Sequence, residues 1–475
     1  MTAPRPFLIG AKWERTDVVE PVTNPYNGRL IAEVCQAGPG EVAEAVESAY
    51  SAFSALKTFP GHMRAKGLAR IATAIEQRGE EIARCICSEA GKPINDARRE
   101  VGRAVQTFQI ASEETTRIPG EVISMDRSPG MENYHGIVRR FPIGPVLGIT
   151  PFNFPLNLIA HKVAPCLAAG NSIVIKPPPQ TPLTSLLLGE AVLESGFPAG
   201  SFSVIPCSNS LAESLVQDTR FQALSFTGSV AVGWMLKSKA GKKRVHLELG
   251  GNAGVVIEPD ASIDTAVHRC IAGGFGYSGQ VCVSVQRIFV QESVYEPFLE
   301  KLIDNVRALP AGDPEKEETV VGPLINQAAV DRLKKWLNEA VSEGATIRTG
   351  GTFQESVMAP TVLTDIKPQM KVSCEEVFGP LVTVSPYGKF EEALHQLNDS
   401  AFGLQAGIFT QDINKIFRAY QELEVGAVLA NEIPSFRADH MPYGGVKDSG
   451  LGREGVRYAI QEMTELKLLV INSSL

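Results

Sequence analysis

The feature that most constrains the fold of this 475-residue sequence is an alternation of short apolar runs with helical segments between about residues 145 and 251. Strands that alternate with helices at this spacing form βαβ units and a parallel sheet. Runs without polar alternation fit strands that are buried on both faces. The predicted strands are 146–150, 172–176, 201–205, 223–229 and 244–251, and the predicted helices are 157–170, 184–196, 210–218 and 233–241.

The flanking regions predict further helices and an extended ribbon. Turn residues followed by alternating apolar residues over 126–152 indicate a hairpin or ribbon. The lone apolar strand 465–472 needs a partner sheet, either in its own chain or in another subunit. A second α/β region is expected from about 253 to 445. Apolar periodicity predicts helices over 40–56, 63–90, 94–112, 293–309 and 328–344, and apolar runs predict strands over 378–387 and 406–410.

Composition excludes several classes of protein. The net charge of -8 argues against nucleic-acid binding, which requires a concentrated basic surface. No apolar run is long enough to cross a bilayer, and the N-terminal segment lacks the apolar stretch and cleavage site of a signal peptide. Eight scattered cysteines form neither a disulfide framework nor a zinc motif. We therefore expect free thiols, no metal, no membrane or nucleic-acid partner, and a cytoplasmic location.

Polar residues stand at or near the ends of several predicted strands. Asn153 and Lys176 follow two of them, Ser229 lies in a Thr-Gly-Ser turn before a helix, and Glu248 precedes two glycines. In open α/β sheets, ligands bind beyond the carboxyl ends of the strands. Each residue also has a structural interpretation, because Asn is common in turns and a strand-end Lys is usually solvated. The glycine turn "GSVAVG" matches neither the P-loop nor the full dinucleotide fingerprint.

Glu248 and Cys282 have the character of catalytic groups. Glu248 lies in the apolar stretch "VHLELGG", where a carboxylate needs a partner or a raised pKa. Cys282 follows a Ser-Gly-Gln turn in "FGYSGQVCVSVQR". A cysteine among apolar residues is more often an inert core thiol than a nucleophile. The local sequence does not decide between the two roles of Cys282.

Taken as an ordered set, these segments resemble the aldehyde dehydrogenase superfamily over nearly the whole chain. The matching segments are Asn153, Lys176, "FTGS", "ELGG", "SGQVC", "EEVFGP" and the closing "MPYGGVKDSGLGREG". "FGYSGQVC" with "FRADHMPYGG" is most similar to the branch of lactaldehyde and non-phosphorylating glyceraldehyde-3-phosphate dehydrogenases. The resemblance implies a Rossmann-like cofactor domain, an α/β catalytic domain and a small β oligomerisation ribbon. It divides the chain into 1–123 with 143–248, 249–447, and 124–142 with 448–475.

The resemblance also implies a chemistry that explains the residue types. Cys282 attacks the aldehyde and forms a thiohemiacetal, and the Asn153 amide donates a hydrogen bond to its oxyanion. After hydride transfer, Glu248 activates the water that hydrolyses the thioester, a role that a Glu with a raised pKa can fill. The expected reaction is NAD(P)-dependent oxidation of a short-chain aldehyde or hydroxyaldehyde to its acid. The expected assembly is a homodimer or homotetramer.

The family pattern further assigns a cofactor site and a candidate substrate contact. Pro179 stands where many NAD-preferring members carry a Glu that binds the adenosine 2′-hydroxyl, so NADP is not excluded electrostatically. Arg437 borders the substrate entrance, either as a hook for an anionic substrate or as a solvated or salt-bridged arginine, whereas Val281 replaces an Arg of some anion-binding members. The assigned cofactor residues are Thr150, Lys176, Pro179, Gly228, Ser229, Gly233, Leu249, Gly250, Glu376 and Phe378.

Two alternatives remain at this point. In a CoA-acylating aldehyde dehydrogenase, CoA instead of water takes the acyl group, and Glu248 counts against this because that branch generally lacks the base. A non-catalytic binding or structural protein on the same fold is the other alternative. The presence of Cys282, Glu248, Asn153 and Lys176 together counts against it.

Overall fold

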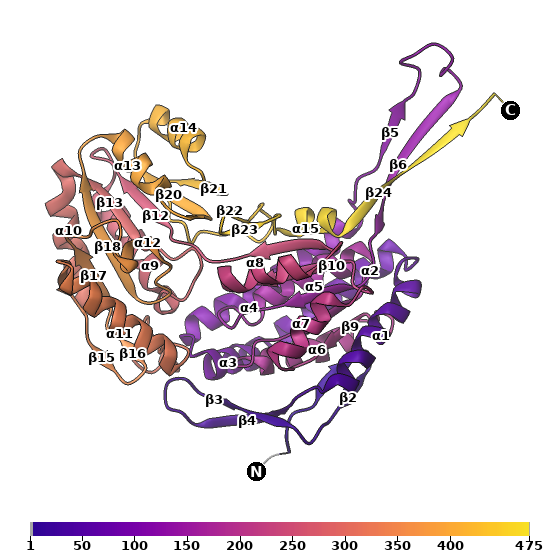
Figure 1. Ribbon diagram of the computed structural model, residues 1–475, viewed down its shortest axis with the longest axis horizontal. Helices are drawn as coiled ribbons and strands as arrows, with labels where there is room; N and C mark the ends of the chain where they lie inside the picture. Colours follow the sequence, from indigo (N-terminus) through magenta and orange to yellow (C-terminus); the bar gives the residue numbers. More distant parts are fainter. Residues whose placement is uncertain (1–2, 475) are drawn as a thin grey trace.

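The computed structural model describes residues 3–474 and has two α/β lobes joined side by side, with a long β ribbon projecting from one of them (Figure 1). The larger lobe is built on an eight-stranded sheet. Its five central strands are parallel, as the alternation predicts, and antiparallel strands complete both edges. In spatial order they are β2 (Lys12–Glu14), β1 (Phe7–Ile9), β9 (Phe202–Val204), β8 (Ile173–Lys176), β7 (Val146–Ile149), β10 (Ala223–Thr227), β11 (Arg244–Glu248) and β23 (Gly450–Leu451).

Helices pack around this sheet, and a buried apolar core fills the space between the layers. The helix predicted over 63–90 is wrong as a single element, because the chain breaks at Arg78. Gly79 follows the break, and glycine disfavours a helix interior by about 1 kcal/mol. The helices are α1 (Pro39–Leu56), α2 (Gly61–Gln77), α3 (Gly79–Ala90), α4 (Ile94–Thr115), α5 (Asn157–Ala169), α6 (Pro182–Leu193), α7 (Asn209–Gln217), α8 (Val230–Lys239) and α15 (Val456–Glu462).

The smaller lobe has a seven-stranded sheet that is parallel except at one edge, where β14 runs antiparallel. It has its own apolar core. The strands in spatial order are β14 (Thr346–Thr349), β17 (Thr361–Thr364), β18 (Leu381–Tyr387), β13 (Arg287–Gln291), β12 (Gly254–Ile257), β20 (Gln405–Phe409) and β21 (Ala427–Ala430). The helices are α9 (Ile263–Phe275), α10 (Glu292–Arg307), α11 (Gln327–Ser342), α12 (Lys371–Cys374), α13 (Phe390–Asn398) and α14 (Ile413–Glu422), with the short 3-10 helix η1 (Gly276–Gly279).

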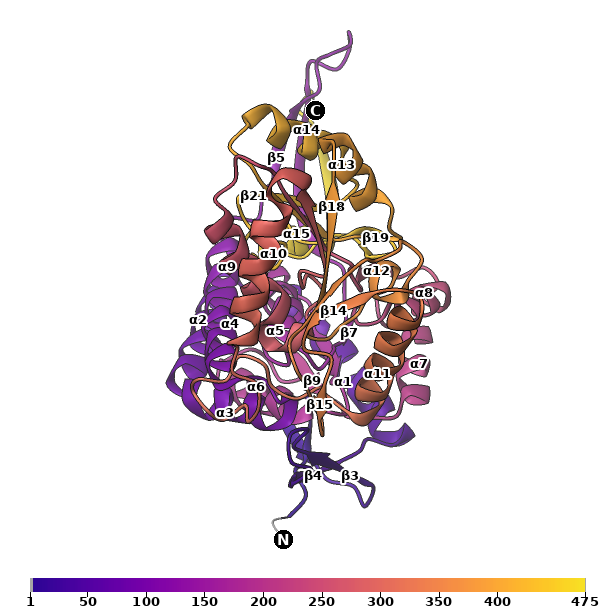
Figure 2. The same ribbon diagram turned by 90° about the vertical axis from the view of Figure 1, so that its left-hand side faces the viewer.

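The ribbon is a three-stranded antiparallel sheet of β5 (Glu121–Ser124), β6 (Tyr134–Pro142) and β24 (Thr464–Asn472), which projects away from both lobes in Figures 1 and 2. The predicted terminal strand therefore finds its partner in its own chain. Short two-stranded sheets complete the structure: β3 (Val19–Thr23) with β4 (Leu30–Cys35), β15 (Phe353–Gln354) with β16 (Val357–Met358), and β19 (Phe402–Gly403) with β22 (Val446–Lys447).

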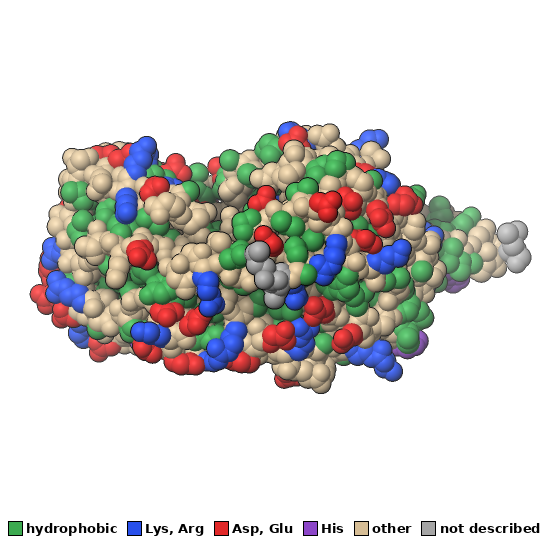
Figure 3. Space-filling model, turned by 90° about the horizontal axis from the view of Figure 1, so that it is seen from below, with side chains coloured by type: hydrophobic (Ala, Val, Ile, Leu, Met, Phe, Trp, Pro, Cys, Tyr) green, Lys and Arg blue, Asp and Glu red, His purple; other side chains and the backbone are tan. Residues whose placement is uncertain are grey.

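The surface is mixed in charge on the face seen in Figure 3, where acidic and basic side chains are interspersed over both lobes. No helix within residues 3–474 is long and apolar enough to span a membrane.

Strand register in the larger sheet determines where the predicted site residues meet. Ile149 pairs with Lys176 across β7 and β8, and Thr227 pairs with Glu248 across β10 and β11. The parallel strands β7, β8, β10 and β11 therefore end at one edge of the sheet, which faces the smaller lobe (Figure 1). The loops that follow them carry the side chains of the candidate site.

Candidate active site

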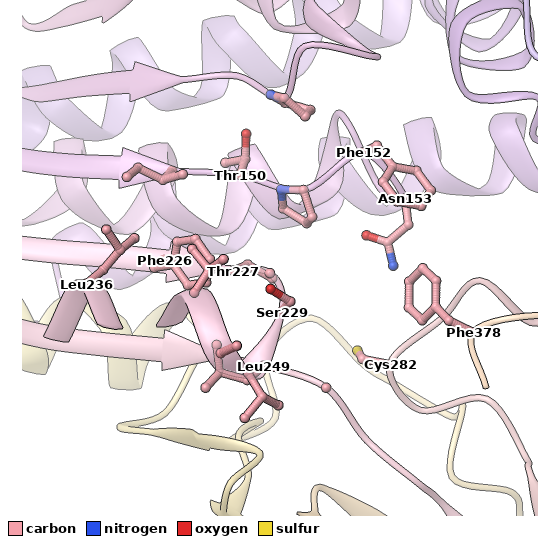
Figure 4. A pocket seen from close by; sticks show the side chains of 18 of the residues that line it. Thr150, Phe152, Asn153, Phe226, Thr227, Ser229, Leu236, Leu249, Cys282 and Phe378 are labelled. Carbon is pink, nitrogen blue, oxygen red and sulfur yellow. The ribbon is translucent and has the colours of Figure 1, made fainter. Parts of the chain in front are cut away.

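A cavity of about 880 Å³ lies beyond the carboxyl ends of these strands. Its wall comes from both lobes, because the loops after the strands of the larger sheet meet segments from the smaller lobe (Figure 4). Eleven of the residues assigned from the sequence line it: Thr150, Asn153, Lys176, Pro179, Gly228, Ser229, Leu249, Gly250, Cys282, Glu376 and Phe378. Gly233, Glu248 and Arg437 lie outside its lining.

Cys282 lies in the loop after η1, and the backbone holds this loop in a tight conformation. Tyr277 and Ser278 have φ of 48° and 56°, in the left-handed region that L residues seldom adopt. Gln280 is fully buried, where its amide donates to the Pro323 carbonyl (3.2 Å) and its Oε1 accepts from the Ile325 N–H (3.0 Å). The nucleophile candidate is therefore carried by a fixed segment.

The thiol of Cys282 is partly exposed, and it lines the cavity. Burial of its surroundings raises the pKa of the thiol to about 12, and the nearby Glu376 and Glu248 act in the same direction. A hydrogen bond with Tyr443, whose hydroxyl lies 3.1 Å from Sγ, lowers it, as does the charge of Arg437. The thiolate thus depends on specific neighbours for its stabilisation.

Asn153 is buried in the loop between β7 and α5, beside the Cys282 loop. Its Nδ2 donates to the Gln280 carbonyl (3.0 Å), whereas its Oδ1 has no hydrogen-bond partner within residues 3–474. Figure 4 shows the carboxamide at the same end of the cavity as the Cys282 sulfur, beside Phe378. An amide in this place has a second N–H for an oxygen atom bound next to Sγ.

A buried ion pair beneath these two loops links them. Glu100 accepts hydrogen bonds from the backbone N–H groups of Leu156 (2.8 Å) and Asn157 (3.1 Å) at the start of α5. Lys92 pairs with Glu100, and both side chains are almost fully buried. The Lys92 ammonium also lies 3.7 Å from the ring centre of Phe154 and 4.4 Å from that of Tyr277. One cation therefore contacts both the Asn153 loop and the Cys282 loop.

Glu248 is the last residue of β11 and is buried. Neither carboxylate oxygen has a hydrogen-bond partner in the described part of the chain, although His246 Nε2 lies 3.3 Å from Oε1. Burial raises the pKa of Glu248 to about 7; the contact with His246 lowers it and the charge of Glu454 raises it. This carboxyl has the pKa of a general base that works near neutrality.

A group of buried charges lies behind Glu248, and the sequence analysis missed most of it. Glu454 accepts from Arg437 Nη2 at 2.8 Å, and its Oε1 lies 3.6 Å from Lys162 Nζ. Burial alone would raise the pKa of Glu454, but Lys162 and Arg437 hold it well below its usual range. The visible signal was His161 and Lys162 in the otherwise apolar helix "NLIAHKVAPCLAAG".

Arg437 is therefore neither solvated nor free. Its side chain is 8% exposed, and its guanidinium lies 3.8 Å from the ring centre of Tyr443. Its Nε has no hydrogen-bond partner among the described residues. Arg437 thus combines a structural ion pair with one unused donor close to the Cys282 region.

The rest of the cavity fits a dinucleotide. Lys176 lies at the end of β8, where burial lowers the pKa of its ammonium, and its Nζ contacts Asn209 Oδ1 at 3.3 Å. Ser229 precedes α8 but its side chain does not cap the helix, so the N-terminal N–H groups are open to an anion. Thr150 Oγ1 is a buried hydroxyl with no partner within residues 3–474.

Close approaches of the backbone shape this part of the cavity. A Cβ on Gly233 would lie 2.3 Å from Leu249 Cδ2, and a Cβ on Gly250 would lie 2.6 Å from Glu376 Oε2. Glu376 accepts from the Gly251 N–H at 2.9 Å, and burial raises the pKa of this carboxyl to about 7. Larger residues at the two glycines would fill the cradle between α8 and Glu376.

A thiol and an amide donor that line a dinucleotide-sized cavity, with a buried carboxylate close by, are the arrangement expected of an oxidoreductase that acts on a carbonyl compound. The model of the Aldehyde dehydrogenase family matches residues 13–469, and the chain belongs to this family. It is an NAD(P)-dependent dehydrogenase that oxidises an aldehyde to its acid. The predicted family, fold class and activity are thereby confirmed.

Similar proteins share nearly the full length of the chain. The 3-sulfolactaldehyde dehydrogenase of Priestia megaterium is 41% identical over 467 residues, 98% of each chain. The lactaldehyde dehydrogenase of Methanococcus aeolicus is 38% identical over 472 residues, 98% of this chain and 100% of the relative. The crystal structure of aldehyde dehydrogenase 21 from Physcomitrella patens, in complex with its reaction product succinate, has a TM-score of 0.98 at 41% identity and covers 100% of this chain and 99% of its own.

Proposed function

We propose that the chain oxidises a short-chain 2-hydroxyaldehyde, with Cys282 as the nucleophile, Asn153 as the oxyanion donor and Glu248 as the base. The observation that carries this proposal is the meeting of the Cys282 thiol and the Asn153 amide at one end of the cavity. Glu248 lies nearby, because a Cβ on Gly251, three residues further on, would lie only 2.1 Å from the Cys282 carbonyl oxygen.

The reaction starts at the sulfur of Cys282. The thiolate forms a bond to the aldehyde carbon, and the electron pair of the C=O bond moves to the oxygen, which accepts a hydrogen bond from Asn153. Such donors are typically worth about 10²–10³ in rate. NAD(P), when bound, would supply the acceptor for the hydride of this adduct. Loss of that hydride would leave the acyl group on Cys282 as a thioester.

Release of the acid needs Glu248. Its carboxylate takes a proton from water as the water oxygen bonds to the thioester carbon, and the C–S electron pair returns to sulfur. A carboxyl with a pKa of about 7 is in its carboxylate form in about half of the molecules at neutral pH, and this fraction rises with pH. The presence of this base favours water over CoA as the acyl acceptor.

The proposed substrate class is supported by the names of two relatives. Lactaldehyde and 3-sulfolactaldehyde, named for two relatives, share a 2-hydroxypropanal skeleton and differ in the substituent at C3. The test is aldehyde-dependent NAD(P)H formation with both compounds and with hexanal, with and without CoA. We expect the hydroxyaldehydes to have the higher kcat/KM without CoA. Preference for hexanal, or a requirement for CoA, would contradict the proposal.

Arg437 is proposed to contact an anionic substituent at C3. The place of Arg437 near the Cys282 region supports this role, whereas its burial outside the cavity lining and its contacts with Glu454 and Tyr443 support the competing structural role. Arg437→Leu should lower kcat/KM for both substrates, because Arg437 also supports Tyr443 and Glu454, but should lower it further for glyceraldehyde 3-phosphate, because only this substrate carries an anion. An equal effect on both substrates would assign Arg437 to structure alone.

NADP is proposed as an accepted cofactor. Pro179 itself has no carboxylate that would repel a 2′-phosphate, and the Lys176 ammonium lines the same cavity. Glu213 also lines it, but its carboxylate is paired with Lys239. Structures of similar enzymes with NADP support this, among them GapN of Methanocaldococcus jannaschii, with a TM-score of 0.92 and 36% identity over 96% of this chain and 100% of its own. The larger lobe is the proposed cofactor domain.

The proposed assembly is a homodimer or a dimer of dimers. The ribbon of β5, β6 and β24 carries exposed apolar side chains, and its projection from the body of the molecule is visible in Figure 3. A second exposed apolar row lies on α14. These residues are Val122, Ile123, Leu466, Leu468, Leu469, Val470 and Ile471 on the ribbon, and Ile413, Phe417 and Tyr420 on α14. Contiguous exposed apolar patches on a protein surface often mark an interaction site. A cytoplasmic location is also proposed, since all eight cysteines are free in the described structure.

A further inference from the structure

Tyr443 is a buried tyrosine whose hydroxyl contacts the reactive sulfur. It is 3% exposed, and its Oη lies 3.1 Å from Cys282 Sγ although the two residues are 161 positions apart in the chain. Its backbone is fixed by two hydrogen bonds with Glu454, from the Tyr443 N–H (3.1 Å) and from the Glu454 N–H (2.6 Å). The contact therefore comes from a rigid part of the structure.

The ring of Tyr443 is held by a cation and by a small apolar cluster. One face lies 3.8 Å from the Arg437 guanidinium, which Glu454 keeps in place at 2.8 Å. The ring also belongs to a small apolar cluster with Val283 and Leu404, against which Cys282 packs. A cation over an aromatic face is attracted to the ring. Its positive charge draws electron density away from the phenol oxygen, which makes the O–H a stronger hydrogen-bond donor. Tyr443 is thus placed and polarised to donate its O–H proton.

The direction of this hydrogen bond follows from the charges around it. Burial raises the pKa of Tyr443 well above its usual range, so the phenol keeps its proton. The titratable groups that influence the Cys282 sulfur are Tyr443, Arg437, Glu376 and Glu248, and both carboxyls disfavour a negative charge there. Of these four, Tyr443 is the group within hydrogen-bonding distance of Sγ.

We propose that Tyr443 is a catalytic residue whose O–H donates a hydrogen bond to Cys282 Sγ and stabilises the thiolate that attacks the aldehyde. The proposal rests on the proposed role of Cys282 as the nucleophile. As the C–S bond forms, the negative charge passes to the aldehyde oxygen and Tyr443 loses its charged acceptor. When the thioester is hydrolysed, the C–S electron pair returns to sulfur, and Tyr443 stabilises the departing thiolate.

The test compares two buried tyrosines. Tyr443→Phe removes only the hydroxyl at Sγ. Tyr387→Phe is the matched control, because the Tyr387 hydroxyl bonds to the Ile257 carbonyl (3.0 Å) and to the Glu258 carboxylate, both outside the site. The measurement is the rate at which iodoacetamide alkylates Cys282 at pH 7.5, followed by peptide mass spectrometry without aldehyde or cofactor. Turnover is not needed, so the result is independent of whether the substrate is correctly assigned.

Loss of a hydrogen bond to a charged group corresponds to a thiol pKa about one to two units higher, and hence to roughly 10- to 100-fold less thiolate. The greater intrinsic reactivity of a more basic thiolate offsets about half of this on a logarithmic scale. We therefore expect Tyr443→Phe to alkylate about 3- to 10-fold more slowly and Tyr387→Phe to match the wild type. An unchanged or faster rate in Tyr443→Phe overturns the proposal.

A graded substitution covers the case in which Tyr443→Phe does not fold. Incorporation of 3-fluorotyrosine at position 443 keeps the ring and makes the hydroxyl a stronger donor. The alkylation rate of Cys282 should then rise above that of the wild type. A rate equal to or below the wild type would overturn the proposal, whereas failure of Cys282→Ala to lose turnover would instead overturn the assignment of the nucleophile.

Discussion

Replacement of Lys92 by Met should destabilise the protein and slow the chemical step, although Lys92 does not line the cavity. The substitution leaves the Glu100 carboxylate buried without its counter-charge and removes a cation from between the Phe154 and Tyr277 rings. Breaking a buried ion pair from one side costs about 3–5 kcal/mol. We expect a loss of that size in the free energy of unfolding.

The catalytic effect follows from what the pair supports. Glu100 fixes the start of α5 directly after the Asn153 loop, and Lys92 contacts the loop that leads to Cys282. A misplacement of about 1 Å in such a site can cost about 100-fold in rate. We expect kcat to fall by at least tenfold in Lys92→Met, with little change in the dissociation constant of NAD(P), because the cofactor contacts lie elsewhere.

The assay is urea unfolding at one fixed protein concentration, combined with steady-state kinetics. Lys301→Met is the matched control, since Lys301 pairs with Asp264 on the surface with side chains 50% and 82% exposed, and such pairs are worth about 0–1 kcal/mol. The double variant Lys92→Met/Glu100→Gln should be less destabilised than the sum of its singles, because it removes both charges. A loss below about 1 kcal/mol in Lys92→Met with full kcat would refute the reasoning.

Three further predictions concern the base, the cofactor and the assembly. In Glu248→Gln a burst of NAD(P)H should precede slow turnover, and a slowed burst without accumulation of acyl-enzyme would give Glu248 another role. In the wild type the deacylation rate should rise with pH through about 7, where the Glu248 carboxyl loses its proton. Pro179→Glu should lower kcat/KM for NADP by about tenfold or more through charge repulsion and change that for NAD much less; equal losses would place the 2′-phosphate elsewhere. Light scattering at micromolar concentration should give a dimer or tetramer, and a monomer would contradict the role of the ribbon and α14.

The elements that could be predicted from the sequence are those whose burial gives a simple hydrophobic pattern. The parallel strands of the larger sheet are covered on both faces, and each is a continuous apolar run. The edge strands β1 and β2 were not predicted, because three residues carry no measurable periodicity and their pairing depends on the distant β9. The break at Arg78 was also missed, since apolar spacing continues across it.

In the candidate site, too, the residues within local motifs could be predicted, whereas the contacts between distant segments could not. The sequence placed Asn153 and Lys176 at strand ends and Cys282 in a loop after a turn, and these residues line one cavity. The contacts of Tyr443 with Cys282 and of Glu454 with Lys162 join segments from opposite parts of the chain. No spacing in the sequence indicates such a contact, because only the tertiary fold brings the partners together.

The most direct test of the central claim is the turnover of Cys282→Ala. Aldehyde-dependent NAD(P)H formation should be abolished in this variant, because no other group at this end of the cavity can form and release the thioester. Binding of NAD(P), followed by fluorescence titration, should be nearly unchanged, because the thiol acts on the aldehyde. Wild-type turnover in the variant would contradict the account, and loss of turnover with intact cofactor binding is the result that it predicts.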